Sequence, residues 1–306
     1  MDGSPARPPR RFALACSRAT LLLIVMLVGV QPVAASAATV SGTDAVNIRS
    51  CASLECDVIG IAPLGAAIEV TGAEDKGWVP ISWGSVRGFA YALYLDSEGK
   101  APWLTQGDPA CKQVALLFNI GIGEAPSQSI IDTLVTEEVD ATMFPMGWWA
   151  ETFPEYLKML DEEGFVIGTH GDQRVFLTTV DDESVTTDIA DSITAIESVI
   201  GHDIEPLMTP YAADTDDRVR RLVGEMGLLP VGWTVAAADY GPEATADSVY
   251  TRVMSGIHPG AIVELHLDGP ATDVSTAAAL PLIIRDLRAQ GYDLVTVPEI
   301  AQPCPR

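Results

Sequence analysis

The feature that most constrains the fold is a regular alternation of short apolar runs and helix-like segments between residues 111 and 301. The runs include VALLFNI, ATMFPMG and GAIVELHLDG, and each precedes a segment whose apolar residues have helical spacing. Repeated units of this kind need parallel strands joined by helical crossovers. The sequence therefore predicts an α/β domain, and about seven strands favour a distorted (β/α) barrel over an open sheet.

Residues 39–97 have a different pattern. They contain short alternating runs such as AVNIR, AIEVTG and GWVPISW, separated by turns, and no helix of normal length fits them. This pattern predicts a small all-β domain, followed by a linker over residues 98–110. The aromatic residues of this domain either line a ligand groove or fill its core; they are Trp78, Trp83, Tyr91 and Tyr94.

Residues 1–37 have the pattern of an export signal: four arginines, the run LLLIVMLVGV, and Ala35-Ser36-Ala37 as an A-x-A cleavage site. About ten apolar residues are too few to span a bilayer, which takes about 20. An uncleaved anchor remains the alternative, because Ala19 and Thr20 lengthen the run. We expect a protein that is secreted or associated with the cell envelope.

The chain is strongly acidic. It has 18 basic and 42 acidic residues and a formal charge of −24. The signal segment carries four of the basic residues and one of the acidic ones, so its removal leaves a charge of −27. Such a surface repels nucleic acid and anionic polymers. We therefore expect no nucleic-acid partner, and we expect a monomer.

Four cysteines remain outside the signal segment, and an even number in an exported chain predicts two disulfides. Three pairings are possible. We favour Cys51 with Cys56 across a turn, and Cys111 with Cys304, which ties the start of the large domain to its end. A zinc site is less well supported, because no C-x-x-C pair occurs.

Candidate site residues follow the predicted strands of the large domain. In parallel α/β barrels, functional residues collect where the strands end. These positions are polar and aromatic, and they hold two of the four histidines. They are Asn119, Gly147 to Trp149, His170 to Arg174, Pro210-Tyr211, Asp239-Tyr240 and His266 to Asp268.

With these residues in place, residues 111–301 resemble the polysaccharide deacetylase (NodB homology) family, and residues 39–97 resemble a bacterial SH3 domain. The first resemblance rests on VALLFNIGIGE, VDATMFPMGWWAE, EEGFVIGTHGDQRVFLT, TPY, WTVAAADY and PGAIVELHLDG. The G-x-G-E turn and GWWAE are most similar to the sporulation-type branch. The second rests on VNIRS, AAIEVTG, Gly77-Trp78 and GFAYALYL. The resemblance implies metal-dependent removal of acetyl groups from glycans, with cell-wall glycan or peptidoglycan as the partner.

The resemblance also implies a metal site, and this sequence departs from it. The family's first motif has two aspartates, a general base and a metal ligand, where this chain has Asn119 and Ile120. An amide cannot accept a proton from water at neutral pH. The second motif has two histidines, where this chain has His170 and Arg174, and a guanidinium has no lone pair for a metal. His170 is thus a residual ligand position, and Asp172 is a weak substitute for the second.

The remaining family motifs are retained at some positions and replaced at others. Met208 replaces an arginine, but Pro210-Tyr211 is present. Ala236 replaces an acidic residue that the resemblance implies would orient the catalytic histidine, so we expect His266, the family's general acid, to be less well oriented. Asp239-Tyr240 keeps the family's acidic–aromatic pair. If catalysis persists, the resemblance makes His266 and Asp239 its candidate residues.

We therefore predict a deacetylase scaffold that has lost its metal chemistry, with no cofactor, and that binds glycan. The candidate binding residues are Asn119, Trp148, Trp149, Arg174, Tyr211 and Tyr240. Two alternatives remain open. One is a working hydrolase, with zinc or with Arg174 as the oxyanion stabiliser, and with Glu124 or Asp172 as the nearest base. The other is an interaction protein whose groove has no role.

Overall fold

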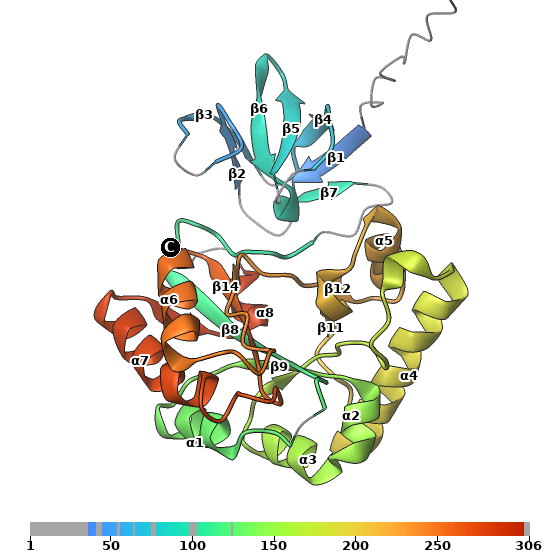
Figure 1. The fold of residues 1–306 in the computed structure, drawn as a ribbon. Coiled ribbons are helices and arrows are strands. Elements are labelled where there is room, and N and C mark those ends of the chain that lie inside the picture. The colour runs from blue at the N-terminus through green and yellow to red at the C-terminus, as the bar shows by residue number, and fades with distance from the viewer. Residues whose placement is uncertain are drawn as a thin grey trace, which may run out of the picture. The chain divides into compact units, whose positions relative to one another are not determined.

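The computed structural model describes residues 36–40, 45–53, 56–63, 65–74, 78–97, 103–123 and 125–302 (Figure 1). Residues 1–35, which include most of the predicted signal segment, lie outside these ranges, as do Glu124 and Cys304. Within the described ranges, no helix has both the length and the apolar character that crossing a membrane requires.

The small domain is a seven-stranded antiparallel sheet with the order β3-β2-β6-β5-β4-β1-β7. Its aromatic residues Trp78, Tyr91 and Tyr94 are buried with Ile48 and Ile81, so they fill the core. The prediction of an all-β domain is confirmed. The strands are β1 (Ser36–Val40), β2 (Ala45–Arg49), β3 (Val58–Pro63), β4 (Ala67–Val70), β5 (Trp78–Trp83), β6 (Val86–Tyr91) and β7 (Leu95–Ser97).

The small domain tests two predictions from the sequence, the end of the signal segment and one disulfide. Strand β1 begins at Ser36, inside the predicted signal segment, because Ser36 and Ala37 pair with Val70 and Glu69 of β4. The disulfide between Cys51 and Cys56 is confirmed, with their Cα atoms 5.7 Å apart.

The large domain is built on parallel strands. One sheet has the order β10-β9-β8-β14-β13, β15 pairs with the first half of β8, and β11 pairs with β12. A bridge between Thr169 and Met208 joins β10 to β11. The strands are β8 (Gln113–Ile120), β9 (Thr142–Pro145), β10 (Val166–Ile167), β11 (Leu207–Met208), β12 (Leu229–Pro230), β13 (Val235–Ala236), β14 (Ala261–His266) and β15 (Asp293–Val295).

Helices lie on the outside of these strands (Figure 1). Local capping fixes several of their ends: the Asp181 carboxylate accepts from the Ser184 amide at the start of α4, and Gly201 ends α4 with a positive φ of 81°. The helices are α1 (Gln128–Thr136), α2 (Gly147–Thr152), α3 (Pro154–Glu162), α4 (Asp182–Ile200), α5 (Asp217–Glu225), α6 (Ala246–Gly256), α7 (Thr276–Ala289) and α8 (Val297–Ile300).

The predicted α/β architecture is confirmed, and the barrel is distorted in a specific way. β10 to β13 have two residues each, and β12 leads to β13 without a helix between them. The apolar run LLPVGWTVAAADY therefore forms two short strands rather than one. The last predicted strand, DLVTVPEI, is shortened to β15, because Thr296 and Glu299 form a capping box that starts α8.

Strand β8 is buried on both faces, and its alternation decides where its last residues point. Leu116, Phe118 and Ile120 pack in the core cluster that includes helices α1 and α7. Ala115 and Leu117 pack in a second cluster with residues of β9 and β14. By the same alternation, Asn119 lies on the face of Ala115 and Leu117, and Ile120 is a fully buried residue of the first core.

We predict that Cys111 pairs with Cys304. Cys111 takes part in a disulfide, but Cys304 lies outside the described residues, so the pairing remains a prediction. Mass-spectrometric mapping of the non-reduced protein is expected to find the Cys111–Cys304 cross-linked peptide. Replacing both cysteines by serine is expected to lower the free energy of unfolding by about 2 to 4 kcal/mol, because the bond closes a long loop. A free thiol at either position contradicts the pairing.

Candidate functional site

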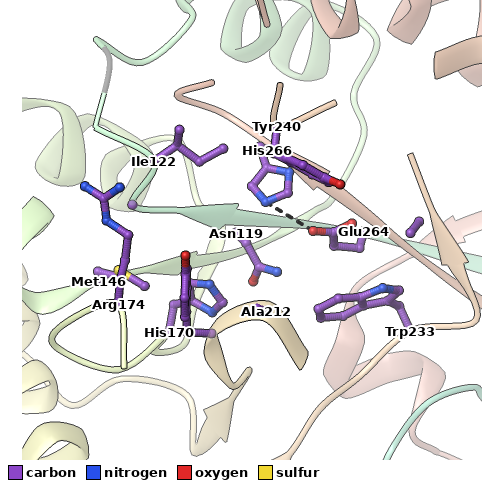
Figure 2. A pocket seen from close by; sticks show the side chains of 13 residues that line it. Asn119, Ile122, Met146, His170, Arg174, Ala212, Trp233, Tyr240, Glu264 and His266 are labelled. Carbon is purple, nitrogen blue, oxygen red and sulfur yellow. Dashed lines mark ion pairs between the residues drawn. The ribbon is translucent and has the colours of Figure 1, made fainter. Parts of the chain in front are cut away.

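A pocket of about 490 Å³ lies where the strands of the large domain end. Its lining brings together residues from β8, β13 and β14 and from the loops after β10, β11 and β12. Six residues predicted from the sequence line it: Asn119, His170, Arg174, Tyr211, Tyr240 and His266. Figure 2 shows their side chains around the pocket.

His170 is held as a neutral imidazole. Its Nδ1 lies 2.9 Å from the Thr209 carbonyl oxygen and 2.8 Å from the Thr209 hydroxyl. Because a carbonyl only accepts, Nδ1 carries the proton and Nε2 keeps its lone pair. Burial, reinforced by the charge of His266, lowers the pKa of His170 to about 3. The ring is therefore uncharged at neutral pH.

Asn119 ends the apolar part of β8 and is only 2% exposed, so its amide needs partners inside the protein. The Thr209 hydroxyl donates to Asn119 Oδ1 at 2.8 Å. Its amide group hydrogen-bonds to the Glu264 carboxylate. Asn119 thus accepts on one side and donates on the other.

His266 has a carboxylate on each ring nitrogen. Nδ1 lies 2.8 Å from Asp239 Oδ1, and Nε2 lies 3.2 Å from Glu264 Oε1. Asp239 also accepts from the His266 backbone amide and the Thr276 hydroxyl, and it is fully buried. Burial alone would lower the pKa of His266, but the Glu264 charge and the hydrogen bond to Asp239 outweigh it and raise the pKa to about 9. His266 is therefore an imidazolium at neutral pH.

This geometry corrects one expectation from the sequence. We expected His266 to lack an orienting carboxylate, because Ala236 stands at the position assigned to it. Asp239 supplies that carboxylate. Ala236 instead pairs in the sheet with Glu264 and lines the pocket.

Glu264 is the residue that the sequence analysis missed. It lines the pocket and is 5% exposed, and burial raises its pKa against the opposing charge of His266. Its signal was present in the sequence: a carboxylate in the otherwise apolar run AIVELH, two residues before His266. Because side chains of a strand alternate, Glu264 and His266 point to the same face.

The polar groups form one chain of hydrogen bonds and one ion pair, which we call the pocket-floor chain. It runs from His170 through Thr209, Asn119 and Glu264 to His266, and ends at Asp239 and Thr276. Figure 2 shows Asn119 between His170 and Glu264, and the ion pair between Glu264 and His266. Each member has its partner within the chain.

The donors present do not fit a catalytic metal. His170 Nε2 is a suitable ligand, but Arg174 adds a positive charge to the same pocket and Ile120 packs in the core. Among the described residues, no group of three or more His, Cys, Asp or Glu side chains is placed to hold a metal ion.

Other predicted residues lie outside the pocket lining, among them Trp148, Trp149 and Asp172. Trp149 is fully buried beside Phe153, with ring centroids 5.5 Å apart, so it is a core residue and offers no face to a ligand. Trp148 lies under Arg174, whose guanidinium carbon is 5.6 Å from its ring centroid. Asp172, a candidate base, accepts from the Gln173 side chain and does not line the pocket.

Asp268 has a structural role at the pocket edge. Its buried carboxylate accepts from the backbone amides of Gly121 and Gly123. Gly121 has a φ of 152°, and a Cβ there would lie 2.5 Å from Met146 Sδ. The turn after β8 therefore needs glycine at this position.

We predict that His266 titrates near pH 9 and that His170 stays neutral throughout the neutral range. NMR of histidine-labelled protein is expected to show this, and Glu264→Gln is expected to lower the pKa of His266 because it removes a neighbouring negative charge. Since the folded-state pKa lies above the ordinary value of 6.5, the contribution of His266 to stability is complete below that value and lost as the pH rises to about 9. A His266 pKa below 7 contradicts the ion pair.

Comparisons with known proteins agree with this fold. Residues 106–231 match the family model of polysaccharide deacetylase, and residues 44–96 match that of the bacterial SH3 domain. A peptidoglycan-N-acetylglucosamine deacetylase of Bacillus cereus is 28% identical over 231 residues, which cover 75% of this chain and 78% of that protein. One from Listeria monocytogenes is 27% identical over 235 residues, 76% of this chain and 48% of that protein.

A solved structure extends the comparison. A pseudoenzyme of the CE4 family from Bacillus anthracis has a TM-score of 0.59 and 23% identity, and the match covers 65% of this chain and 69% of that one. This likeness supports the fold. In chain order, residues 44–96 thus match the model of the bacterial SH3 domain and residues 106–231 match that of polysaccharide deacetylase.

Proposed function

We propose that this protein is exported and binds cell-wall glycan without hydrolysing it. The observation that carries the proposal is the donor set of the pocket, in which the neutral imidazole of His170 is accompanied by a guanidinium rather than by further metal ligands. The relatives named above deacetylate peptidoglycan, which points to the same class of glycan as the ligand.

The loss of hydrolysis follows from three local features. Asn119 cannot act as a base, and its amide is committed to Thr209 and Glu264. The metal donors are incomplete. His266, the candidate acid, has Nδ1 and Nε2 paired with carboxylates, so neither proton faces a leaving group freely. The pseudoenzyme from Bacillus anthracis offers a precedent for this fold without catalysis.

Glycan binding is supported by the aromatic walls of the pocket. Tyr211, Trp233 and Tyr240 line it, and Tyr240 is 59% exposed. Phe176, 52% exposed, packs edge-on against Tyr211 at 5.5 Å between ring centroids. Aromatic faces of this kind stack on sugar rings. The SH3 domain gives the chain a second candidate element for cell-wall attachment.

A metal-independent hydrolase is the second candidate, and one observation favours it. The sequence offered only Glu124 and Asp172 as bases near Asn119, whereas the structure places the Glu264 carboxylate there. However, Glu264 is paired with His266, and a base and an acid bonded to each other do not act separately on a substrate. We therefore favour the binding role.

We predict that the purified full chain contains less than stoichiometric zinc, cobalt or nickel and releases no acetate from acetylated chito-oligomers or peptidoglycan. Elemental analysis and an acetate assay with and without added zinc check this. Arg174→His is the matched control, because a second imidazole is expected to raise zinc content. A tight equivalent of metal in the wild type overturns the proposal. Metal-free acetate release that Glu264→Gln abolishes establishes the second candidate instead.

A further inference from the structure

The pocket has opposite charges on opposite sides. Arg174 lines one side and Glu264 lines the other, and Figure 2 shows them separated across the cavity. Glu264 and Trp233 both line the pocket, and both are drawn on the right of Figure 2. A ligand that enters the pocket therefore meets a cation at one end and, at the other, a carboxylate paired with the His266 imidazolium.

The Glu264 side is acidic. The two carboxylates Glu264 and Asp239 flank a single imidazolium, His266, so acidic groups outnumber basic ones on this side. Asp239 is fully buried and its oxygens are taken by His266 and Thr276. Of the two carboxylates, Glu264 is the one that lines the pocket.

Glu264 also has acceptor capacity left. A carboxylate has about four lone-pair sites, and Glu264 uses two of them, for His266 Nε2 and the Asn119 amide. A ligand of opposite charge stabilises the ionised form of a buried carboxylate. The site thus favours a ligand with hydrogen-bond donors and a positive charge at this position.

We infer that the pocket recognises the free ammonium group of a de-N-acetylated amino sugar, with Glu264 as its acceptor and the aromatic walls holding the sugar rings. This inference rests on the proposed glycan-binding function and specifies its ligand. The protein then binds the product of deacetylation rather than its substrate. An N-acetyl group at this position would lack the charge and would bring a carbonyl oxygen towards the carboxylate. Arg174 repels an ammonium group from the other side, which fixes the orientation of the ligand.

The test is calorimetric titration of the full chain with a glucosamine oligosaccharide and with its fully N-acetylated counterpart of equal length, in about 0.15 M salt to screen the acidic surface. We expect the wild type to bind the glucosamine oligosaccharide at least about tenfold more tightly, as for a charge-assisted hydrogen bond. Glu264→Gln is expected to reduce that preference to within about twofold. Glu163→Gln, the same change of charge at an exposed position, is expected to leave it intact.

The outcomes separate this inference from the proposed function. Equal binding of both sugars by the wild type overturns the inference and leaves glycan binding in place. Undetectable binding of both sugars overturns the inference and the proposed glycan-binding function together. An unchanged preference in Glu264→Gln, or equally tight binding of a lysine oligomer of the same charge, assigns the effect to the acidic surface and overturns the inference. If Glu264→Gln does not fold, the binding of the two sugars and of the lysine oligomer by the wild type still tests the inference.

Discussion

The site depends on the pocket-floor chain, which links the polar side chains under the cavity to one another. It begins at the neutral His170 and ends at the carboxylate of Asp239. Because buried polar groups are expensive without partners, the members of such a network constrain one another. A substitution at one position of the chain therefore changes which residues are suitable at the neighbouring positions.

Asn119 and Glu264 illustrate this dependence. An aspartate at position 119 would set two buried carboxylates against each other, whereas the amide donates to Glu264 and accepts from Thr209. Glu264 in turn helps to keep His266 protonated. Asn119, one of the departures from the deacetylase pattern, is thus compatible with the residues on both sides of it in the chain. A site of this kind supports ligand recognition.

The sequence predicted the elements and the ring of strand ends, because apolar periodicity and strand-end chemistry are local signals. It assigned Trp149 less well, since the direction of a side chain at the end of an element depends on packing. Trp149 turns into the core. The partner of His266 was misassigned because the family resemblance put the orienting carboxylate at position 236, whereas Asp239 bonds to the ring. Glu264 was missed because it lies at a position that the family motifs did not mark, although its charge inside a buried strand was a visible signal.

The most direct test of this account is a double-mutant cycle on the stability of the folded protein, with Asn119→Asp and Glu264→Gln made singly and together. The account predicts that Asn119→Asp alone is strongly destabilising, because it places a second buried carboxylate against that of Glu264. It is expected to be much less destabilising when combined with Glu264→Gln, because the glutamine amide donates to the new carboxylate. The coupling energy is expected to exceed about 0.5 kcal/mol. Strictly additive effects would show that the two residues do not interact and would contradict the pocket-floor chain.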